Sequence, residues 1–420
     1  MPQSTAVKYF RYSDAGAPTL TGAAGDMVAL LHACLVTGYN VSAVDSITRD
    51  GTTVTVTVNA GHGLEQGVVA EISGADQAEY NGEHRITTAT ADTFEFELEA
   101  AETPVTPATG TIEVRMAPAS WERSFVSGDN QRAAFKSLAV DATGMYLYID
   151  DTNNQGTRRT GVKGYESMTD IDTGINPFPY SSADDQWYWW YKSADETSAL
   201  RWAVVADDKW FYLWWNRATD SNESYGRLNA FGDLISYVPA DVWHCLVTGE
   251  HSITDEAYQS MLATAPLEYS AGAVVNQSGV SIARDYLGVG DSKMSGAIFP
   301  AVTIYIYSSR TICNVVGGYG VDFPSHITGG AIVAPVDAVE VCGSGCVLRG
   351  RNPGMYSPFH MRPYSRIEPE LVQGTGDLAD RRFLSLPFAG GVLKMSAGSS
   401  TYTNYHKYGQ ALIDVIGPWR

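Results

Sequence analysis

Basic residues are scarce in this sequence, and that scarcity excludes two classes of partner. Lys and Arg total 28 among 420 residues, against 47 Asp and Glu, so the net charge is −19. A protein that binds nucleic acid by neutralising phosphates needs an excess of cations. An anionic membrane surface attracts the same kind of basic cluster. We therefore expect no nucleic-acid partner and no attraction to a membrane surface.

Long apolar runs and a leader sequence are also absent. The longest apolar stretches, such as residues 301–307, fall far short of the roughly 20 residues that span a bilayer. Residues 1–5 do not open the pattern of a secretory signal peptide, in which a basic region precedes an apolar one. We expect a protein made in a cytosol without membrane insertion.

Cysteines are too few and too scattered for a disulfide framework. Of the five, Cys342 and Cys346 form the one closely spaced pair. Their C-x3-C spacing lacks the second ligand pair that a structural zinc needs, so we expect no metal. A disulfide across the intervening turn, a disulfide between subunits and two free thiols all remain open.

Sequence motifs of catalysis are missing as well. There is no HExxH, no GxxxxGK[ST], no GxSxG and no GxGxxG between a strand and a helix. The glycine-rich residues 343–350 lack the end of a phosphate loop and fit a tight turn better. His62 fits a turn residue that hydrogen-bonds locally, and the acidic residues 150–151 and 207–209 fit solvated turns. We expect neither enzymatic activity nor a cofactor.

Aromatic and turn-forming residues, in contrast, are abundant. The chain has 24 Tyr, 10 Trp, 41 Gly and 18 Pro, the usage of a turn-rich β protein. Residues 54–58 and 93–98 alternate strictly between polar and apolar, as half-buried strands do. Further strands are expected at 68–72, 83–87, 110–114, 145–149, 200–205, 210–215, 302–307, 331–333 and 412–416. The predicted fold is mainly β, with antiparallel sandwich or barrel-like domains and few helices.

One short amphipathic helix is expected near the N-terminus. Its apolar residues fall at helical spacing and form one stripe: Met27, Leu30, Leu31, Cys34 and Leu35. Asp26 is the expected N-cap and Gly38 the expected C-terminal cap. The stripe has two interpretations, docking onto a neighbouring protein through Met27, Leu30, Leu31 and Leu35 or packing on the chain's own β body. A second helix is expected over residues 254–262.

The length accommodates two or three domains. Residues 1–48 form an N-terminal lead and helix, and residues 49–115 a small inserted β domain of about six strands that folds alone. The dipeptide Asn81-Gly82 signals a hairpin turn inside this domain. Residues 116–420 form a β-rich body, which a division near residue 270 would split into two subdomains.

A tryptophan cluster in the body has two interpretations. Its members are Trp187, Trp189, Trp190, Trp214 and Trp215. Wide aromatics on alternating strands usually anchor a core or a subunit interface, which is the favoured interpretation. Aromatic rings with nearby carboxylates also stack on sugars. Buried rings would favour the structural interpretation, and exposed coplanar rings would favour glycan binding.

Several stretches resemble a family of tailed-bacteriophage virion proteins. Residues 7–10, 16–22 and 30–40 look like the opening of that family. Residues 230–241 resemble its "FGD…Y…GD" segment, and residues 349–363 resemble its "RG…PG…PLH.RP" segment. Short strings within 49–115 are similar to small β modules of phage tail and baseplate proteins. The Cys342/Cys346 pair is not part of the family pattern.

The resemblance implies a non-enzymatic structural component of a tailed-phage virion, made in the bacterial host cytoplasm. It implies a neck, collar or tail protein that forms or decorates an oligomeric ring. The expected partners are other copies of the chain and neighbouring neck, connector or tail proteins, with no active site or cofactor. The alternative is a tail-tip or baseplate protein that binds a host receptor or glycan.

Overall fold

The computed structural model describes residues 2–420 apart from several segments. The segments outside the description are residues 153–158, 180–186, 193–196, 217–225, 251–277, 286, 291–292, 295–301, 304–311, 314–317, 320–332, 343–344, 359–368, 394–395, 398–399 and 402–404. The helix expected at 254–262 and the centre of the glycine-rich turn at 343–344 therefore lie outside the described residues.

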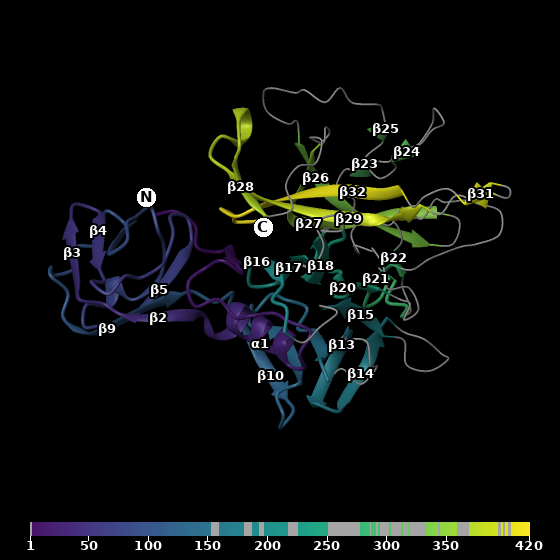
Figure 1. Ribbon diagram of the computed structural model, residues 1–420, viewed down its shortest axis with the longest axis horizontal. Coiled ribbons are helices and arrows are strands. Elements are labelled where there is room, and N and C mark those ends of the chain that lie inside the picture. Colours follow the sequence, from purple (N-terminus) through teal and green to yellow (C-terminus); the bar gives the residue numbers. More distant parts are fainter. Residues whose placement is uncertain are drawn as a thin grey trace.

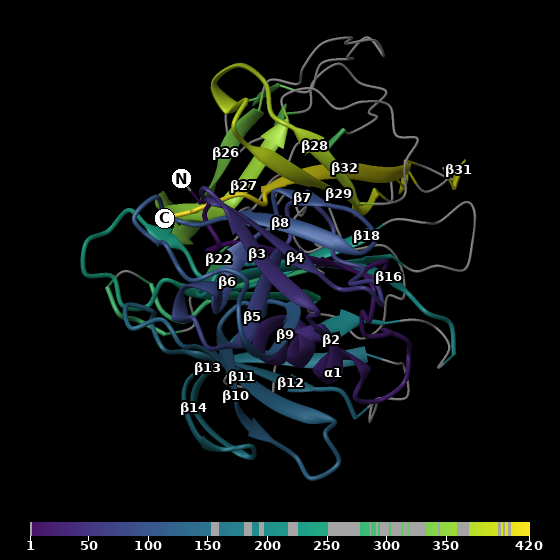
Figure 2. The same cartoon turned by 90° about the vertical axis from the view of Figure 1, so that its left-hand side faces the viewer.

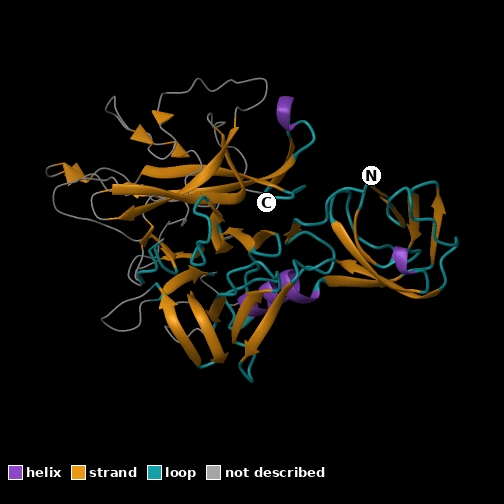
Figure 3. Cartoon of the chain, turned by 180° about the vertical axis from the view of Figure 1, so that it is seen from behind, coloured by secondary structure: helices purple, strands orange, loops and turns teal. Residues whose placement is uncertain are grey.

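Antiparallel strands dominate the described chain (Figures 1 and 3), which confirms the predicted fold class. Among the described strands no sheet closes on itself, so the sheets are open rather than barrels. The helical elements of the described ranges are α1 (Asp26–His32), the π-helical η1 (Ala33–Thr37) and the 3-10 helices η2 (Ala78–Tyr80) and η3 (Gly376–Leu378). None of the described helices has the length and apolar character needed to cross a membrane.

An inserted module, residues 39–116, consists of two four-stranded sheets. One has the order β2-β9-β5-β6, with β2 (Tyr39–Ala43), β9 (Gly110–Met116), β5 (Val69–Ala75) and β6 (Gly82–Arg85). The other has the order β3-β4-β8-β7, with β3 (Ser46–Asp50), β4 (Thr53–Thr57), β8 (Thr93–Glu97) and β7 (Thr88–Ala89). Because β2 pairs with β9, the module begins ten residues before the predicted start at 49. It projects to the left of the body in Figure 1.

The module's core follows from the alternation of its strands. Val54 pairs with Phe96 and Val56 with Phe94, and all four side chains are buried. The His84 ring stacks on Phe96 at a centroid distance of 3.9 Å and so connects the two sheets.

The hairpin between β5 and β6 differs from the expected two-residue turn. Its loop contains η2, and the Asn81 amide donates to the Ala75 carbonyl at 2.7 Å and accepts from the Ala75 N–H at 2.9 Å. The Asn side chain thus replaces the backbone bonds that a tight turn would make.

The body contains two larger sheets, which form separate layers in Figure 2. The thirteen-stranded sheet contains β1 (Lys8–Arg11), β10 (Trp121–Val126), β11 (Arg132–Ser137), β12 (Tyr146–Asp150), β13 (Arg159–Asp170), β14 (Thr173–Phe178), β15 (Tyr188–Tyr191), β16 (Arg201–Ala206), β17 (Trp210–Asn216), β18 (Gly226–Asp233), β20 (Cys245–Glu250), β21 (Ser278–Ile282) and β22 (Lys293–Met294). The seven-stranded sheet contains β19 (Ile235–Ser236), β23 (Val302–Thr303), β26 (Val333–Cys342), β27 (Gly345–Pro358), β28 (Glu370–Gln373), β29 (Arg382–Leu393) and β32 (Tyr405–Asp414). Two small hairpins remain, β24 (Ile312–Cys313) with β25 (Gly318–Tyr319) and β30 (Ser396–Ala397) with β31 (Ser400–Thr401).

The two body sheets do not divide at residue 270, which itself lies outside the described residues. Strands β21 and β22 follow that position and still belong to the first sheet, whereas β19 precedes it and belongs to the second. The chain therefore crosses between the sheets more than once, and a single cut would not separate them.

Strand β17 is buried on both faces, because the body packs against each side of it. All seven of its residues are buried. On one face, Phe211 and Trp215 contact Trp190, with ring centroids 6.3 and 6.4 Å apart. On the other face, the Tyr212 hydroxyl donates to the Pro353 carbonyl of the seven-stranded sheet at 2.9 Å.

Helix α1 starts one residue earlier than expected and has a different cap. Gly25 occupies the N-cap with φ 87°, while the Asp26 carboxylate accepts bonds from the Thr21 N–H and hydroxyl. The Met27 N–H donates instead to the Asp151 carboxylate at 3.0 Å.

The apolar stripe of this helix is covered by the chain itself. Met27, Leu30, Leu31 and Leu35 are each 0% exposed. The docking interpretation is corrected accordingly, because a stripe that fills the protein's own core presents nothing to a neighbouring protein.

Candidate functional site

The two central stretches that carry the family resemblance meet in space. Ile235 pairs with Arg351 and Ser236 with Gly350, so residues 230–241 lie beside the start of the 349–363 stretch. We call this meeting point the sheet junction and define it by Asp233, Asp241, Arg349, Gly350 and Arg420. It joins the thirteen-stranded sheet to the seven-stranded sheet.

A buried ion pair is at the centre of the sheet junction. The Arg349 guanidinium contacts Asp241 through Nε at 2.7 Å and through a terminal nitrogen at 2.9 Å, and both side chains are 0% exposed. The same guanidinium donates to the Arg284 carbonyl at 3.1 Å, and Asp241 also accepts from the Trp243 N–H at 3.0 Å. This two-point geometry compensates for the loss of water around both charges.

Backbone geometry constrains two small residues of the sheet junction. Ala240, which precedes Asp241, has a φ of 64°, in the left-handed region. A non-glycine residue is strained there. A side chain at Gly350 would place its Cβ 2.6 Å from the Ile235 carbonyl oxygen, so the close approach of β19 and β27 requires glycine.

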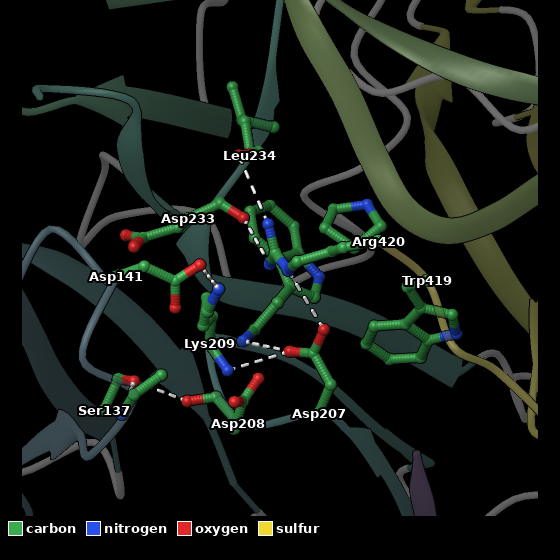
Figure 4. Close-up of polar contacts among 12 residues, drawn as sticks. Ser137, Asp141, Asp207, Asp208, Lys209, Asp233, Leu234, Trp419 and Arg420 are labelled. Atoms are coloured by element: carbon green, nitrogen blue, oxygen red, sulfur yellow. Dashed lines mark hydrogen bonds and ion pairs between the residues drawn. The ribbon is translucent and has the colours of Figure 1, made fainter. Parts of the chain in front are cut away.

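A second polar cluster completes the sheet junction (Figure 4). The Arg420 side chain contacts Asp207 at 3.2 Å and donates to the backbone carbonyls of Asp233 at 2.7 Å and Leu234 at 3.4 Å. The Asp233 carboxylate in turn accepts from the Thr143 N–H at 2.7 Å and hydroxyl at 2.6 Å. The C-terminal segment is thereby fixed to the ends of β17 and β18.

The prediction of a solvated turn at residues 207–209 is wrong for Asp207. It was expected in a solvated turn, but it is only 4% exposed, and its carboxylate accepts from the N–H groups of Lys209 at 2.9 Å and Trp210 at 2.7 Å. Burial raises the pKa of Asp207, and the nearby Arg420 opposes that rise. The cluster therefore organises a turn, and its neighbouring pair Lys209–Asp141 at 2.5 Å extends it toward the surface.

The prediction of a solvated turn at residues 150–151 is wrong for Asp151. Its carboxylate is completely buried and lies 2.6 Å from Nζ of Lys192, which is also completely buried. Asp150, the preceding residue, is half-buried and accepts from the Thr152 hydroxyl at 2.6 Å.

The tryptophan cluster separates into two groups. Trp190, Trp214 and Trp215 are at most 1% exposed, so they belong to the core and are not available to a glycan. Trp187 and Trp189 are half-buried on the other face of the sheet, with centroids 6.2 Å apart and planes tilted by 33°.

The half-buried rings belong to an outer aromatic face. It is separate from the main core and contains Phe125, Tyr146, Tyr148, Tyr165, Trp187 and Trp189. The Tyr148 ring packs against Trp187 and Tyr165, with centroid distances of 5.7 and 6.0 Å. The Lys163 ammonium lies 4.0 Å from the centre of the Trp187 ring, a close cation–π contact. Sequence patterns do not predict this face, because its rings come from four strands.

The remaining candidates from the sequence are the cysteine pair and His62. In the β26–β27 hairpin Cys342 pairs with Gly345 and Cys346 with Val341, so the two cysteines are not opposite each other in the register. Their side chains lie outside the description, and the disulfide stays a prediction. His62 accepts from the Leu64 N–H at 3.0 Å through Nδ1, as expected of a turn residue. Within the described ranges no three His, Cys, Asp or Glu side chains gather as a metal site would require.

Comparison with known proteins finds only distant structural similarity. No protein-family model matches the chain, and no curated protein matches it. Among solved structures, phage phi92 endosialidase aligns over 90% of this chain and 71% of that chain, at 10% identity and a TM-score of 0.17. A superposition this poor carries no argument about fold or function.

Proposed function

We propose that this chain is a non-enzymatic structural component of a tailed-phage virion. It would belong to the neck, collar or tail and form or decorate an oligomeric ring there. The sheet junction carries the proposal. The residues that resemble the virion family, including Asp233, Asp241, Arg349 and Gly350, meet where the two body sheets are joined.

The chemistry of the sheet junction supports a structural role for these residues. Asp241 faces a guanidinium, Asp233 accepts a backbone N–H and a hydroxyl, and Asp207 caps a turn. A general acid or nucleophile must instead reach a substrate atom. Asp241 and Arg349 are completely enclosed by the chain, which fits maintenance of a fold.

The net charge of −19 fits assembly on a template. Like charges keep free subunits apart in solution, and a preformed neck or tail ring would supply the complementary surface. The free protein is then expected to be monomeric, while particle-bound copies share the symmetry of the ring.

Immunogold labelling of intact particles tests the location. An antibody against the inserted module should label the neck, collar or tail. Absence of label, with the protein present in the same lysate, would contradict a virion role. Incubation with host surface polysaccharide should release no reducing ends, and release abolished by changing a single Asp or Glu would overturn the non-enzymatic part.

The outer aromatic face supports a second candidate function, glycan binding by a host-contact protein. All of its rings except the buried Tyr148 are half-buried. The Lys163 ammonium lies over the Trp187 ring and the Lys136 ammonium over the Tyr146 ring. Aromatic faces beside hydrogen-bonding cations are suited to stacking on sugars.

Surface plasmon resonance with immobilised host polysaccharide distinguishes the two candidates. A glycan-binding protein should lose its response on Trp187→Ala and keep it on Tyr237→Ala, which alters an aromatic residue that is 43% exposed outside this face. If the unmodified protein shows no binding response, glycan binding is contradicted and the structural role is the one supported.

A further inference from the structure

Asp151 and Lys192 meet across a strand in the interior of the body. Asp151 directly follows β12, Lys192 directly follows β15, and β13 pairs with both strands. The distance from Nζ to Oδ1 is 2.6 Å, and both side chains are 0% exposed. The interior therefore holds an amine and a carboxyl group in contact, with water excluded.

Three further groups hydrogen-bond to the Asp151 and Lys192 side chains. From β13, the Thr160 hydroxyl donates to Asp151 Oδ1 at 2.6 Å. The Met27 N–H donates to Asp151 Oδ2 at 3.0 Å, and Lys192 Nζ donates to the Ala23 carbonyl. An amide linking the two side chains would have one N–H and one carbonyl oxygen. The Ala23 carbonyl and the Met27 N–H are already in place for those two groups.

We propose that Lys192 and Asp151 condense to form an intramolecular isopeptide bond. A buried ion pair can become neutral by proton transfer, because a low-dielectric interior disfavours both charges. Transfer of one proton from Nζ to Oδ1 leaves a free amine beside a neutral carboxylic acid. Burial also raises the pKa of Asp151, although Lys192 and Thr160 oppose the rise.

The condensation then balances without a further reactant. The lone pair of Nζ attacks Cγ of Asp151 and forms the C–N bond, while negative charge collects on Oδ2 beside the Met27 N–H. The C–Oδ1 bond breaks, and Oδ1 leaves as water with the proton that it gained and a second proton from Nζ. Thr160, hydrogen-bonded to Oδ1, is placed to relay that second proton. The product keeps one N–H toward Ala23.

Intact-mass spectrometry of the full-length protein tests the bond and is independent of the proposed function. The mass should be lower than the sequence mass by one water molecule. Trypsin should yield a branched peptide joining residues 137–158 to residues 164–201, with no cleavage after Lys192. The Lys192→Arg variant keeps the charge but cannot condense, so its mass should equal its sequence mass.

A second variant distinguishes the isopeptide bond from loss of water at another residue. Asp151→Asn should form the same amide by losing ammonia, and its product should have the mass of the wild-type product. An unmodified wild-type mass with linear peptides 137–158 and 164–192 would overturn the proposal. So would a water loss that Lys192→Arg retains, because it would place the dehydration at another residue.

Discussion

The inserted module and the body are both antiparallel β structures, but their ion pairs differ in exposure to solvent. The module has thirteen acidic and three basic residues, ten of the chain's nineteen net negative charges. Its ion pair Arg115–Glu71 is solvent-accessible, with side chains 39% and 27% exposed. The body, in contrast, buries the ion pair Asp241–Arg349 completely. The module is thus stabilised by alternating strands around an apolar core, and the body also depends on paired charges inside it.

Removal of the module should have the largest effect on the protein. Tyr39 and Met116 are paired, so the two chain ends at the base of the module are neighbours. Replacing residues 39–116 by a short Gly/Ser linker should leave a soluble body that unfolds cooperatively, as followed by circular dichroism in urea. A deletion that began at residue 46 would instead keep β2 and remove its partner β9.

Removing the module also deletes several contacts to the N-terminal lead. Arg85 donates to the carbonyls of Ser4 at 2.6 Å and Val7 at 2.7 Å, and Glu83 pairs with Lys8 at 2.8 Å. We expect lower stability of the shortened protein but retained folding. Insoluble or non-cooperative protein would show that the module is part of the body's own core.

The next largest effect is expected at the buried ion pair. Asp241→Ala leaves the enclosed Arg349 guanidinium without its carboxylate counter-charge and should lower the free energy of unfolding by about 3–5 kcal/mol. The matched change in the module, Glu71→Ala, should cost about 0–1 kcal/mol, because that pair is hydrated. Urea denaturation of both variants measures the difference. Equal losses would contradict the contrast between module and body.

Some of this contrast could be predicted from the sequence and some could not. Strict alternation at Val54, Val56, Phe94 and Phe96 is local information, and it located β4 and β8 correctly. Asp207 looked like a solvated turn, because its partner Arg420 is 213 residues away in the chain. Asp151 was misjudged for the same reason, since Lys192 lies two strands away.

The tryptophans and the helix show the same limit. Alternation cannot distinguish a half-buried strand from one covered on both faces. The sequence therefore favours a core or interface role for Trp214 and Trp215 without excluding glycan contact. The stripe of α1 predicted a surface to be covered, but which surface covers it depends on the tertiary packing. The aromatic face could not be found, because Tyr148 and Trp187 come together only when the sheet forms.

A smaller effect should appear in the pH dependence of Asp207→Asn. Burial raises the folded-state pKa of Asp207 above its usual 3.8, so the folded state binds this proton more readily than the unfolded chain. Between 3.8 and the raised value, the wild type therefore loses stability as pH rises. The variant has no titrating group at this position. Its free energy of unfolding should rise relative to wild type across this window in urea titrations, and a relative fall would contradict the pKa direction.

The smallest effect concerns the strained turn of the sheet junction. Ala240 has a φ of 64°, and the left-handed region costs a residue with a Cβ about 1–2 kcal/mol. Glycine loses more conformational entropy on folding, by about 0.5–1 kcal/mol. Ala240→Gly should therefore stabilise the protein by about 0.5–1 kcal/mol in thermal unfolding.

The control for this change is Asn130→Gly. Asn130 has a φ of 58°, and asparagine tolerates that region better than alanine does. The control should gain less than Ala240→Gly. A loss of stability at Ala240→Gly would mean that the alanine methyl group contributes packing that outweighs the strain.

Counting copies per particle tests whether this chain is a structural part of the virion. Quantitative mass spectrometry of gradient-purified phage should find this chain in a fixed ratio to the capsid protein. A structural component of a ring predicts a whole number of copies in multiples of three or six. Absence of the chain from purified particles, with its full amount left in the lysate, would contradict the account.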